Sequence, residues 1–179
     1  MNIFNNESKY GLISIVFHWI MALIIIVTFL LGLNLKHNYQ YYYEILKLHN
    51  SFGITIFLLA IFRITWKFIN IQPARLPNKK IFMKLATFNH IFFYILFFMM
   101  PITGYLLTNL QGDIVSFYGV GLPEIIESNR DFKNYTHIVH DLLGNILLIL
   151  FGLHVLGALY HHYLIKDNTL RRITFFKMK

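Results

Sequence analysis

Residues 140–154 read HDLLGNILLILFGLH, an apolar run with a histidine at each end. In a helix that rises about 1.5 Å and turns about 100° per residue, His140 and His154 would share one face and lie about 21 Å apart along the axis. A titratable ring in lipid is costly and normally faces the interior of a helix bundle for a functional reason. The run therefore predicts a membrane-spanning helix that offers one imidazole in each half of the bilayer.

The composition of the chain also indicates a membrane protein. Of the 179 residues, 56% are hydrophobic and only 13% are charged, and the mean hydropathy is +0.54. Four runs are long enough to supply the roughly 20 residues that a helix needs to cross a bilayer. They cover residues 12–33, 48–69, 85–110 and 138–165. We expect the first run to remain in the mature protein, because it is too long for a signal peptide and no small-residue cleavage site follows it.

Short connections between the runs favour one all-α domain over residues 1–179, an integral membrane four-helix bundle with up-and-down topology. Most of the 16 Lys and Arg residues fall before the first run, around the connection between the second and third, or after the fourth. By the positive-inside rule, both termini are then cytoplasmic. The net charge of +8 follows from this topology and from attraction to anionic lipid, and it needs no nucleic acid partner.

Depth in the membrane predicts how the histidines pair. With the N-terminus inside, His18 lies at the inner depth of His154, and His49 lies at the outer depth of His140. Two imidazoles at each depth, an apolar bundle and the absence of cysteine suit two haem b groups, each held between two histidines. Zinc or copper would need three or four clustered ligands instead.

Several other polar residues have competing interpretations. His90 lies at inner depth and could replace either inner ligand, although a supporting role behind the ligands or a contact to a haem carboxylate suits it better. Arg63 either extends to the membrane surface or pairs with a haem carboxylate. His161 and His162 either lie at the inner interface or form a proton route to a quinone. The outer histidines His37 and His137 have no predicted role.

Glycines lie close to the predicted ligands along the same runs, at Gly53, Gly144, Gly152 and Gly157. Such positions let a flat macrocycle approach the backbone. Ordinary packing of small residues between membrane helices explains each of them equally well.

Several strings in this chain resemble the bacterial cytochrome b561 family of inner-membrane di-haem proteins. They are SIVFHW (14–19), LHNSFGI (48–54), FR (62–63), PITGY (101–105), HDLLGN (140–145) and LHVLGALYHHYLIKDNTLRR (153–172). The resemblance covers nearly the whole chain, and residues 161–170 are its most specific part. It implies that His18 and His154 bind the iron of the inner haem and that His49 and His140 bind that of the outer haem, in agreement with the pairing by depth.

The resemblance also implies an activity. The family moves electrons between haem and ubiquinone in the bacterial inner membrane, and one branch oxidises superoxide at the periplasmic face. A basic outer surface would attract that anion. The charge count does not favour it, because Lys36, Lys47, Arg130 and Lys133 stand against Glu44, Asp113, Glu124, Glu127, Asp131 and Asp141.

Three functions therefore compete. The favoured one is a quinone-linked membrane oxidoreductase that takes electrons from a small donor such as superoxide. The second is a cytochrome b anchor subunit that conducts electrons for a larger hydrogenase or dehydrogenase, so an oligomer or a partner subunit stays open. The third is a transporter or proton relay that uses histidines, Asp141 and Arg63 without haem. Broken spans typical of such transporters are not evident, since Pro101 is the single proline within the runs.

Overall fold

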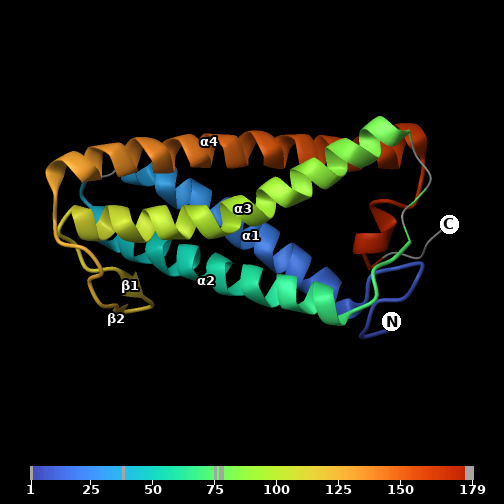
Figure 1. Cartoon of the computed structure of the whole chain (residues 1–179), viewed down its shortest axis with the longest axis horizontal. Coiled ribbons are helices and arrows are strands. Elements are labelled where there is room, and N and C mark those ends of the chain that lie inside the picture. The colour runs from blue at the N-terminus through green and yellow to red at the C-terminus, as the bar shows by residue number, and fades with distance from the viewer. Residues whose placement is uncertain (1, 38, 75, 77–78, 176–179) are drawn as a thin grey trace.

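The computed structural model describes residues 2–37, 39–74, 76 and 79–175. These residues form four long antiparallel helices, α1 (Leu12–Leu35), α2 (Tyr42–Ile69), α3 (Lys80–Leu110) and α4 (Arg130–Tyr160) (Figure 1). Each helix is long and apolar enough to cross a membrane. The predicted all-α four-helix membrane bundle is confirmed.

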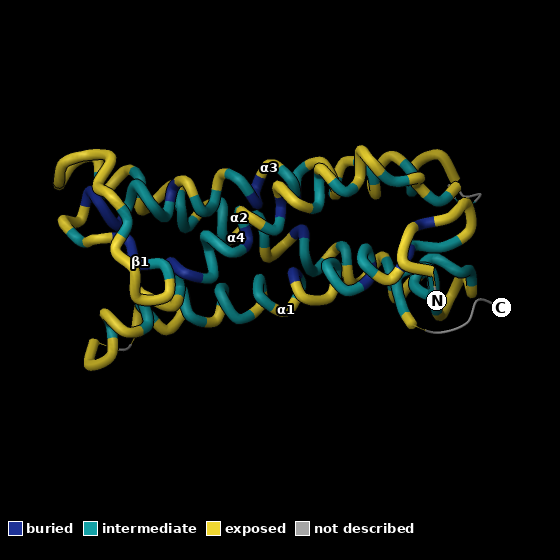
Figure 2. Tube along the Cα trace, turned by 90° about the horizontal axis from the view of Figure 1, so that it is seen from below, coloured by how far each residue is buried: buried dark blue, intermediate teal, exposed yellow. Residues whose placement is uncertain are grey.

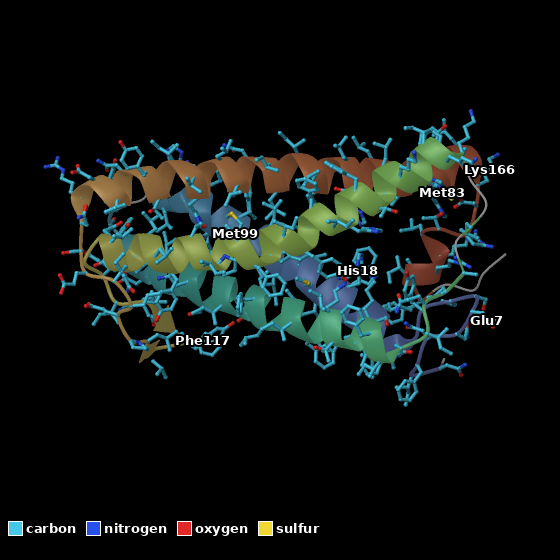
Figure 3. The ribbon with its side chains drawn as sticks, in the orientation of Figure 1. Glu7, His18, Met83, Met99, Phe117 and Lys166 are labelled. Atoms are coloured by element: carbon cyan, nitrogen blue, oxygen red, sulfur yellow. The ribbon has the colours of Figure 1, made fainter. Side chains whose placement is uncertain are left out.

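The two ends of the bundle differ in what they contain. Glu7, Met83 and Lys166 mark the end where the N-terminal and C-terminal segments lie, and Phe117 marks the opposite end (Figure 3). We call these the termini side and the hairpin side. Which of them faces the cytoplasm stays a prediction, and Arg75, Lys177 and Lys179, three of the basic residues behind it, lie outside the described residues.

The helices extend beyond the apolar runs. The length of an apolar run reflects the thickness of the lipid, whereas a helix can continue into polar sequence outside the lipid. The clearest case is α4, which starts at Arg130 in a polar stretch. The side chain of Asn129 accepts hydrogen bonds from the backbone N–H groups of Asp131 and Phe132, and Asp131 adds negative charge to the first turn.

Packing between the helices is uneven. Helix α1 packs along α2, α3 along α4, and α2 against α3, around a small core that includes Met21, Ile56, Ala60 and Phe97. Within the described residues, α4 makes at most sparse backbone contact with α1 and with α2. Exposed residues follow the outer surfaces of the helices (Figure 2), where large side chains such as Leu23 suit contact with lipid.

A small β-hairpin interrupts the connection between α3 and α4, for which the sequence predicted no strands. Strands β1 (Ser116–Phe117) and β2 (Val120–Gly121) pair antiparallel, with Phe117 opposite Val120. Tyr118 and Gly119 join them with φ angles of 48° and 92°, as a tight two-residue turn requires. The backbone N–H of Tyr118 donates to Ser51 Oγ (2.9 Å), which fixes the hairpin to α2.

At the termini side, the chain before α1 and the chain after α4 both fold against the bundle. Asn5 is buried, and its side chain accepts hydrogen bonds from Gly11 N (2.8 Å) and Ser14 Oγ (2.7 Å) while donating to Ile71 O (2.9 Å). Helix α4 continues as a π-helical turn, η1 (His161–Ile165), and a 3-10 helix, η2 (Arg171–Ile173), follows. Both segments therefore close this end of the bundle.

We predict that Gly11→Ala destabilises the protein, because a Cβ at this position would lie 2.4 Å from Ile3 O and 2.5 Å from Phe4 O, and backbone atoms cannot move aside cheaply. Overpacking of this kind costs about 1–3 kcal/mol, or several degrees in melting temperature. Thermal unfolding in detergent, followed by circular dichroism, measures the change. Gly157→Ala is the control, because nothing lies within 4 Å of its added Cβ. Equal melting temperatures for both variants would contradict the prediction.

Candidate functional site

The structure brings the predicted histidines together as two pairs. His18 of α1 faces His154 of α4 as the termini-side pair, and His49 of α2 faces His140 of α4 as the hairpin-side pair. The ring centres are 6.2 Å apart in both pairs. His18 lies in the half of the bundle nearer to Glu7 and Lys166 (Figure 3). The grouping is the one expected from depth, and the binding of iron by these side chains stays a prediction.

The spacing within each pair suits one metal atom between two imidazoles. Bonds of about 2.0 Å from a metal to one nitrogen of each ring would hold the ring centres about 6 Å apart. Each pair also spans two helices, α1 with α4 and α2 with α4, whose backbones make at most sparse contact among the described residues, although side chains such as Leu150 of α4 and Met21 of α1 share the core. A flat cofactor between the rings would therefore lie where the helix backbones do not approach each other closely.

The hairpin-side pair is already in the protonation form that a metal needs. His49 Nδ1 lies 2.9 Å from Thr28 O, and because a carbonyl only accepts, this nitrogen must carry the hydrogen. His140 Nδ1 lies 2.9 Å from Thr103 Oγ1, whose own hydrogen is directed to the carbonyl of Met99 or Met100. Both rings thus donate from Nδ1, which leaves the Nε2 lone pairs free to bind a metal.

Two glycines on neighbouring helices make room for these rings. A Cβ at Gly32 would lie 3.0 Å from His49 Cε1, and one at Gly104 would lie 3.2 Å from His140 Cε1. A larger residue would push the imidazole out of position. Gly104 belongs to the string PITGY, but no local pattern marks Gly32, because its role depends on which helix lies beside it.

A cavity of about 470 Å³ adjoins the hairpin-side pair, within the size range of small-molecule and cofactor sites. Its lining includes His49, His140, Gly32, Gly53, Gly104 and Gly144. Of the glycines expected to leave room for a macrocycle, Gly53 and Gly144 therefore do line a cavity. Gly152 and Gly157 have open space beside them.

Basic residues gather around this cavity. Lys36, Lys133 and His137 line it together with one acid, Asp141, and the Lys36 Nζ to Asp141 Oδ2 distance is 2.7 Å. The other acidic residues of the hairpin side do not line the cavity. His137, for which no role was predicted, thus belongs to the cavity lining.

The termini-side pair has a different partner. Arg63 is half-buried, and its Nη2 lies 3.1 Å from His18 Nδ1. A guanidinium only donates hydrogen bonds, so His18 Nδ1 must accept, and the neutral ring then carries its hydrogen on Nε2. A metal bond at that Nε2 requires Arg63 to release Nδ1. Arg63 is therefore beside the predicted ligand, in a position from which it must move when a metal binds.

His90 also lies near this pair, with its ring 5.6 Å from that of His154. Helix packing favours His18 over His90 as the second ligand, and the choice stays a prediction. His90 is on α3, which packs along α4. His18 is on α1, which does not. Within the described residues, no group of three or more His, Asp or Glu side chains could hold a metal ion.

The remaining histidines of the termini side lie around η1. His161 Nδ1 is 2.6 Å from Asp167 Oδ2, and the side chain of Asp167 also accepts from the backbone N–H of Thr169. Partial burial would raise the pKa of Asp167, but the hydrogen bonds from His161 and Thr169 outweigh it and lower that pKa. His162 Nδ1 is buried without a hydrogen-bond partner.

Comparison with known proteins agrees with the resemblance. A family model described as prokaryotic cytochrome b561 matches residues 9–176. Cytochrome b561 homolog 2 of Escherichia coli K12 is 31% identical over 178 residues, which cover 97% of this chain and 95% of the relative. The protein named "Probable superoxide oxidase CybB" of Yersinia pestis is 31% identical over 172 residues, covering 93% and 96%. Cytochrome b561 homolog 1 of Escherichia coli K12 is 30% identical over 171 residues, covering 93% and 97%.

We predict that Thr103→Val weakens haem binding at the hairpin-side pair, because His140 Nδ1 loses its hydrogen-bond acceptor while the side-chain volume is kept. Loss of such a supporting partner lowers affinity about 10-fold to 100-fold. Titration of the apoprotein with haem, followed by absorption, measures the change. Thr65→Val is the matched control, since Thr65 also bonds the preceding helical turn, at Ile61 O, but is exposed. Unchanged affinity in Thr103→Val would show that His140 needs no such partner.

Proposed function

This chain belongs to the prokaryotic cytochrome b561 family, and from that membership we propose that it holds two haem b groups and moves electrons from a small donor to ubiquinone. The family and the four apolar helices make it a multi-pass bacterial membrane protein and a b-type cytochrome of electron transfer. The number of haems, the donor, the quinone and the inner membrane as its location are the proposal.

The observation that carries the proposal is the position of the two histidine pairs. Each pair joins helices that hardly contact each other, with ring centres 6.2 Å apart. We assign His18 and His154 to the iron of one haem and His49 and His140 to the iron of the other. Simple packing does not explain this arrangement, because facing imidazoles would be a poor filling for an apolar bundle.

When bound, haem supplies reversible one-electron chemistry at its iron. The side chains of this chain would hold it through axial nitrogens and keep water away. Between the two pairs, the rings of Phe93 and Phe97 stack with centres 5.5 Å apart, and Phe93 also contacts the ring of His154. Phe97 in turn lines the hairpin-side cavity. An aromatic wall on α3 therefore joins the surroundings of both sites.

Charge supports the orientation that we propose. Arg63, Lys67, Lys84, Lys166 and Arg172 all belong to the termini side, which by the positive-inside rule we assign to the cytoplasm. The hairpin side then faces the periplasm, and its cavity opens there.

A small anion such as superoxide fits the hairpin-side cavity better than the overall charge count suggested. Lys36 and Asp141 of the lining are paired with each other, so Lys133 leaves that lining with a net positive charge. A locally basic lining raises the concentration of an anionic donor. The name of the Yersinia pestis relative points to the same donor.

Ubiquinone would take up protons when it is reduced, and we propose that this happens on the termini side. His161 and Asp167 are hydrogen-bonded to each other there, close to the aqueous boundary. A hydrogen-bonded histidine and carboxylate suit a proton route of this kind.

We predict two haem b groups per chain in the detergent-purified protein, measured by absorption spectra before and after dithionite and by the pyridine haemochrome method. His140→Leu and His154→Leu should each lower the count to one, because each removes one axial ligand from one site. His37→Leu, at an exposed position, should leave both haems in place. Superoxide-dependent reduction of a ubiquinone analogue then tests the activity.

Each failure of this experiment has its own meaning. A colourless protein that stays haem-free when haem is supplied would overturn the proposal and leave the transporter or proton-relay function. Two haems without reaction with superoxide would favour the conducting anchor subunit, which should then be purified together with a soluble partner.

A further inference from the structure

The segment after α4 folds back onto the start of the bundle. We call residues 166–173 the C-terminal strap. It leaves η1 at Lys166, whose φ of 59° turns the chain sharply, and it ends beside α1, where Trp19 Nε1 donates to Ile173 O (2.8 Å). Figure 1 shows this strap returning beside the N-terminal part of α1. Trp19 follows His18 in the chain but is 45% exposed, so this bond fixes the strap to α1 at the height of a predicted haem ligand and on a different side of the helix.

Arg172 is the side chain that the strap brings inward. Its Nη1 donates to Ala74 O (2.6 Å), and Ala74 N in turn donates to Glu7 O (2.8 Å). The guanidinium is thus held where the strap, the connection after α2 and the N-terminal segment meet. Its Nε is buried and has no hydrogen-bond partner among the residues that the structure describes. A buried donor without an acceptor costs stability and indicates that a group is missing from its surroundings.

A second guanidinium acts on the same part of the protein. Tyr10 precedes α1, and although burial raises its pKa, the positive charges of Arg63 and then Arg172 act in the opposite direction. Both arginines therefore exert an electrostatic effect on one tyrosine. The ion pairs found among the described residues are Lys36 with Asp141 and His161 with Asp167, so neither arginine has a carboxylate partner there.

Arg63 also needs a new partner when a metal binds. Its guanidinium must release His18 Nδ1, as argued above, and it is half-buried, so it then needs another acceptor nearby. Haem brings two carboxylates, and planar guanidinium groups bind carboxylates with two parallel hydrogen bonds.

We propose that Arg172 and Arg63 bind the carboxylates of the haem held by His18 and His154, so that the C-terminal strap forms one wall of that site. This inference rests on the proposed function, since it needs a haem at the termini-side pair. The acceptor is an anionic oxygen, which a lipid phosphate could also supply. The buried Nε of Arg172 favours a ligand inside the bundle over a lipid headgroup at its surface.

The test compares Arg172→Gln with Arg172→Lys and Arg171→Gln. Arg171→Gln is the matched control, because this substitution removes the same charge from the same 3-10 helix. No hydrogen bond of the Arg171 side chain is seen among the described residues. Apoproteins are titrated with haem and with haem dimethyl ester, whose carboxylates are blocked. We expect Arg172→Gln to weaken haem binding at the termini-side pair about 10-fold or more. Arg171→Gln should not, and Arg172→Lys should restore part of the loss.

The ester separates a carboxylate contact from a structural role. We expect Arg172→Gln and the unaltered protein to bind the ester equally weakly at this site. The midpoint potential of the termini-side haem should also fall in Arg172→Gln, because a nearby positive charge that favours the reduced form is lost.

Three outcomes would overturn the inference. Equal weakening for haem and its ester would mean that Arg172 only supports the fold, and equal effects of Arg171→Gln and Arg172→Gln would mean general electrostatics or lipid binding. Full haem binding by Arg172→Gln would exclude the contact altogether. If the unaltered protein holds no haem at His18 and His154, the proposed function fails first, and an unchanged haem count in His154→Leu reveals this separately from any arginine variant.

Discussion

An imidazole in the hydrocarbon region of a membrane must find a partner for each of its two nitrogens, and the arrangement of this bundle follows from that need. His18, His49, His140 and His154 lie on helices that are otherwise apolar, and they face one another across α1 with α4 and α2 with α4. Both helix pairs make at most sparse backbone contact in the described part of the chain. Helix α4 is therefore held by α3 on one side, and a cofactor would hold it on the other. Two haems would complete the packing of the bundle as well as carry its chemistry.

The two sites differ in the hydrogen-bond partner of the histidine Nδ1 atoms. On the hairpin side, Thr28 O and Thr103 Oγ1 accept from the Nδ1 atoms, and both rings are ready to bind a metal without rearrangement. On the termini side, Arg63 donates to His18 and holds the ring in the opposite tautomer. The first site is preorganised, whereas the second has to exchange one hydrogen bond for another before it can work. Such a difference separates the affinities and potentials of two sites that share the same ligands.

Patterns of short range in the sequence were enough to predict the helices and the pairs. The apolar runs reveal the spans, and a fixed rise per residue turns positions such as 140 and 154 into depths. What lies beside a helix could not be predicted in this way. Gly32 matters only because His49 packs on it, and Thr28 contributes a backbone carbonyl that any residue would supply. The bond from Trp19 to Ile173 joins residues 154 positions apart, and no local pattern announces it. The hairpin has one local signal in the sequence, the glycine after Tyr118. A single glycine in a long connection is not enough to predict a hairpin.

The presence of α4 in both histidine pairs has a consequence for biosynthesis. As the chain leaves the ribosome, α1, α2 and α3 can enter the membrane and pack, since α1 with α2 and α2 with α3 make direct contacts. At that stage His18 and His49 lack the α4 histidines that face them in the folded protein, so each site has only one of its two paired imidazoles. Insertion of α4 supplies the second imidazole of both pairs in a single step. If both pairs hold haem, as proposed, neither haem could gain its second axial histidine before the last helix is translated.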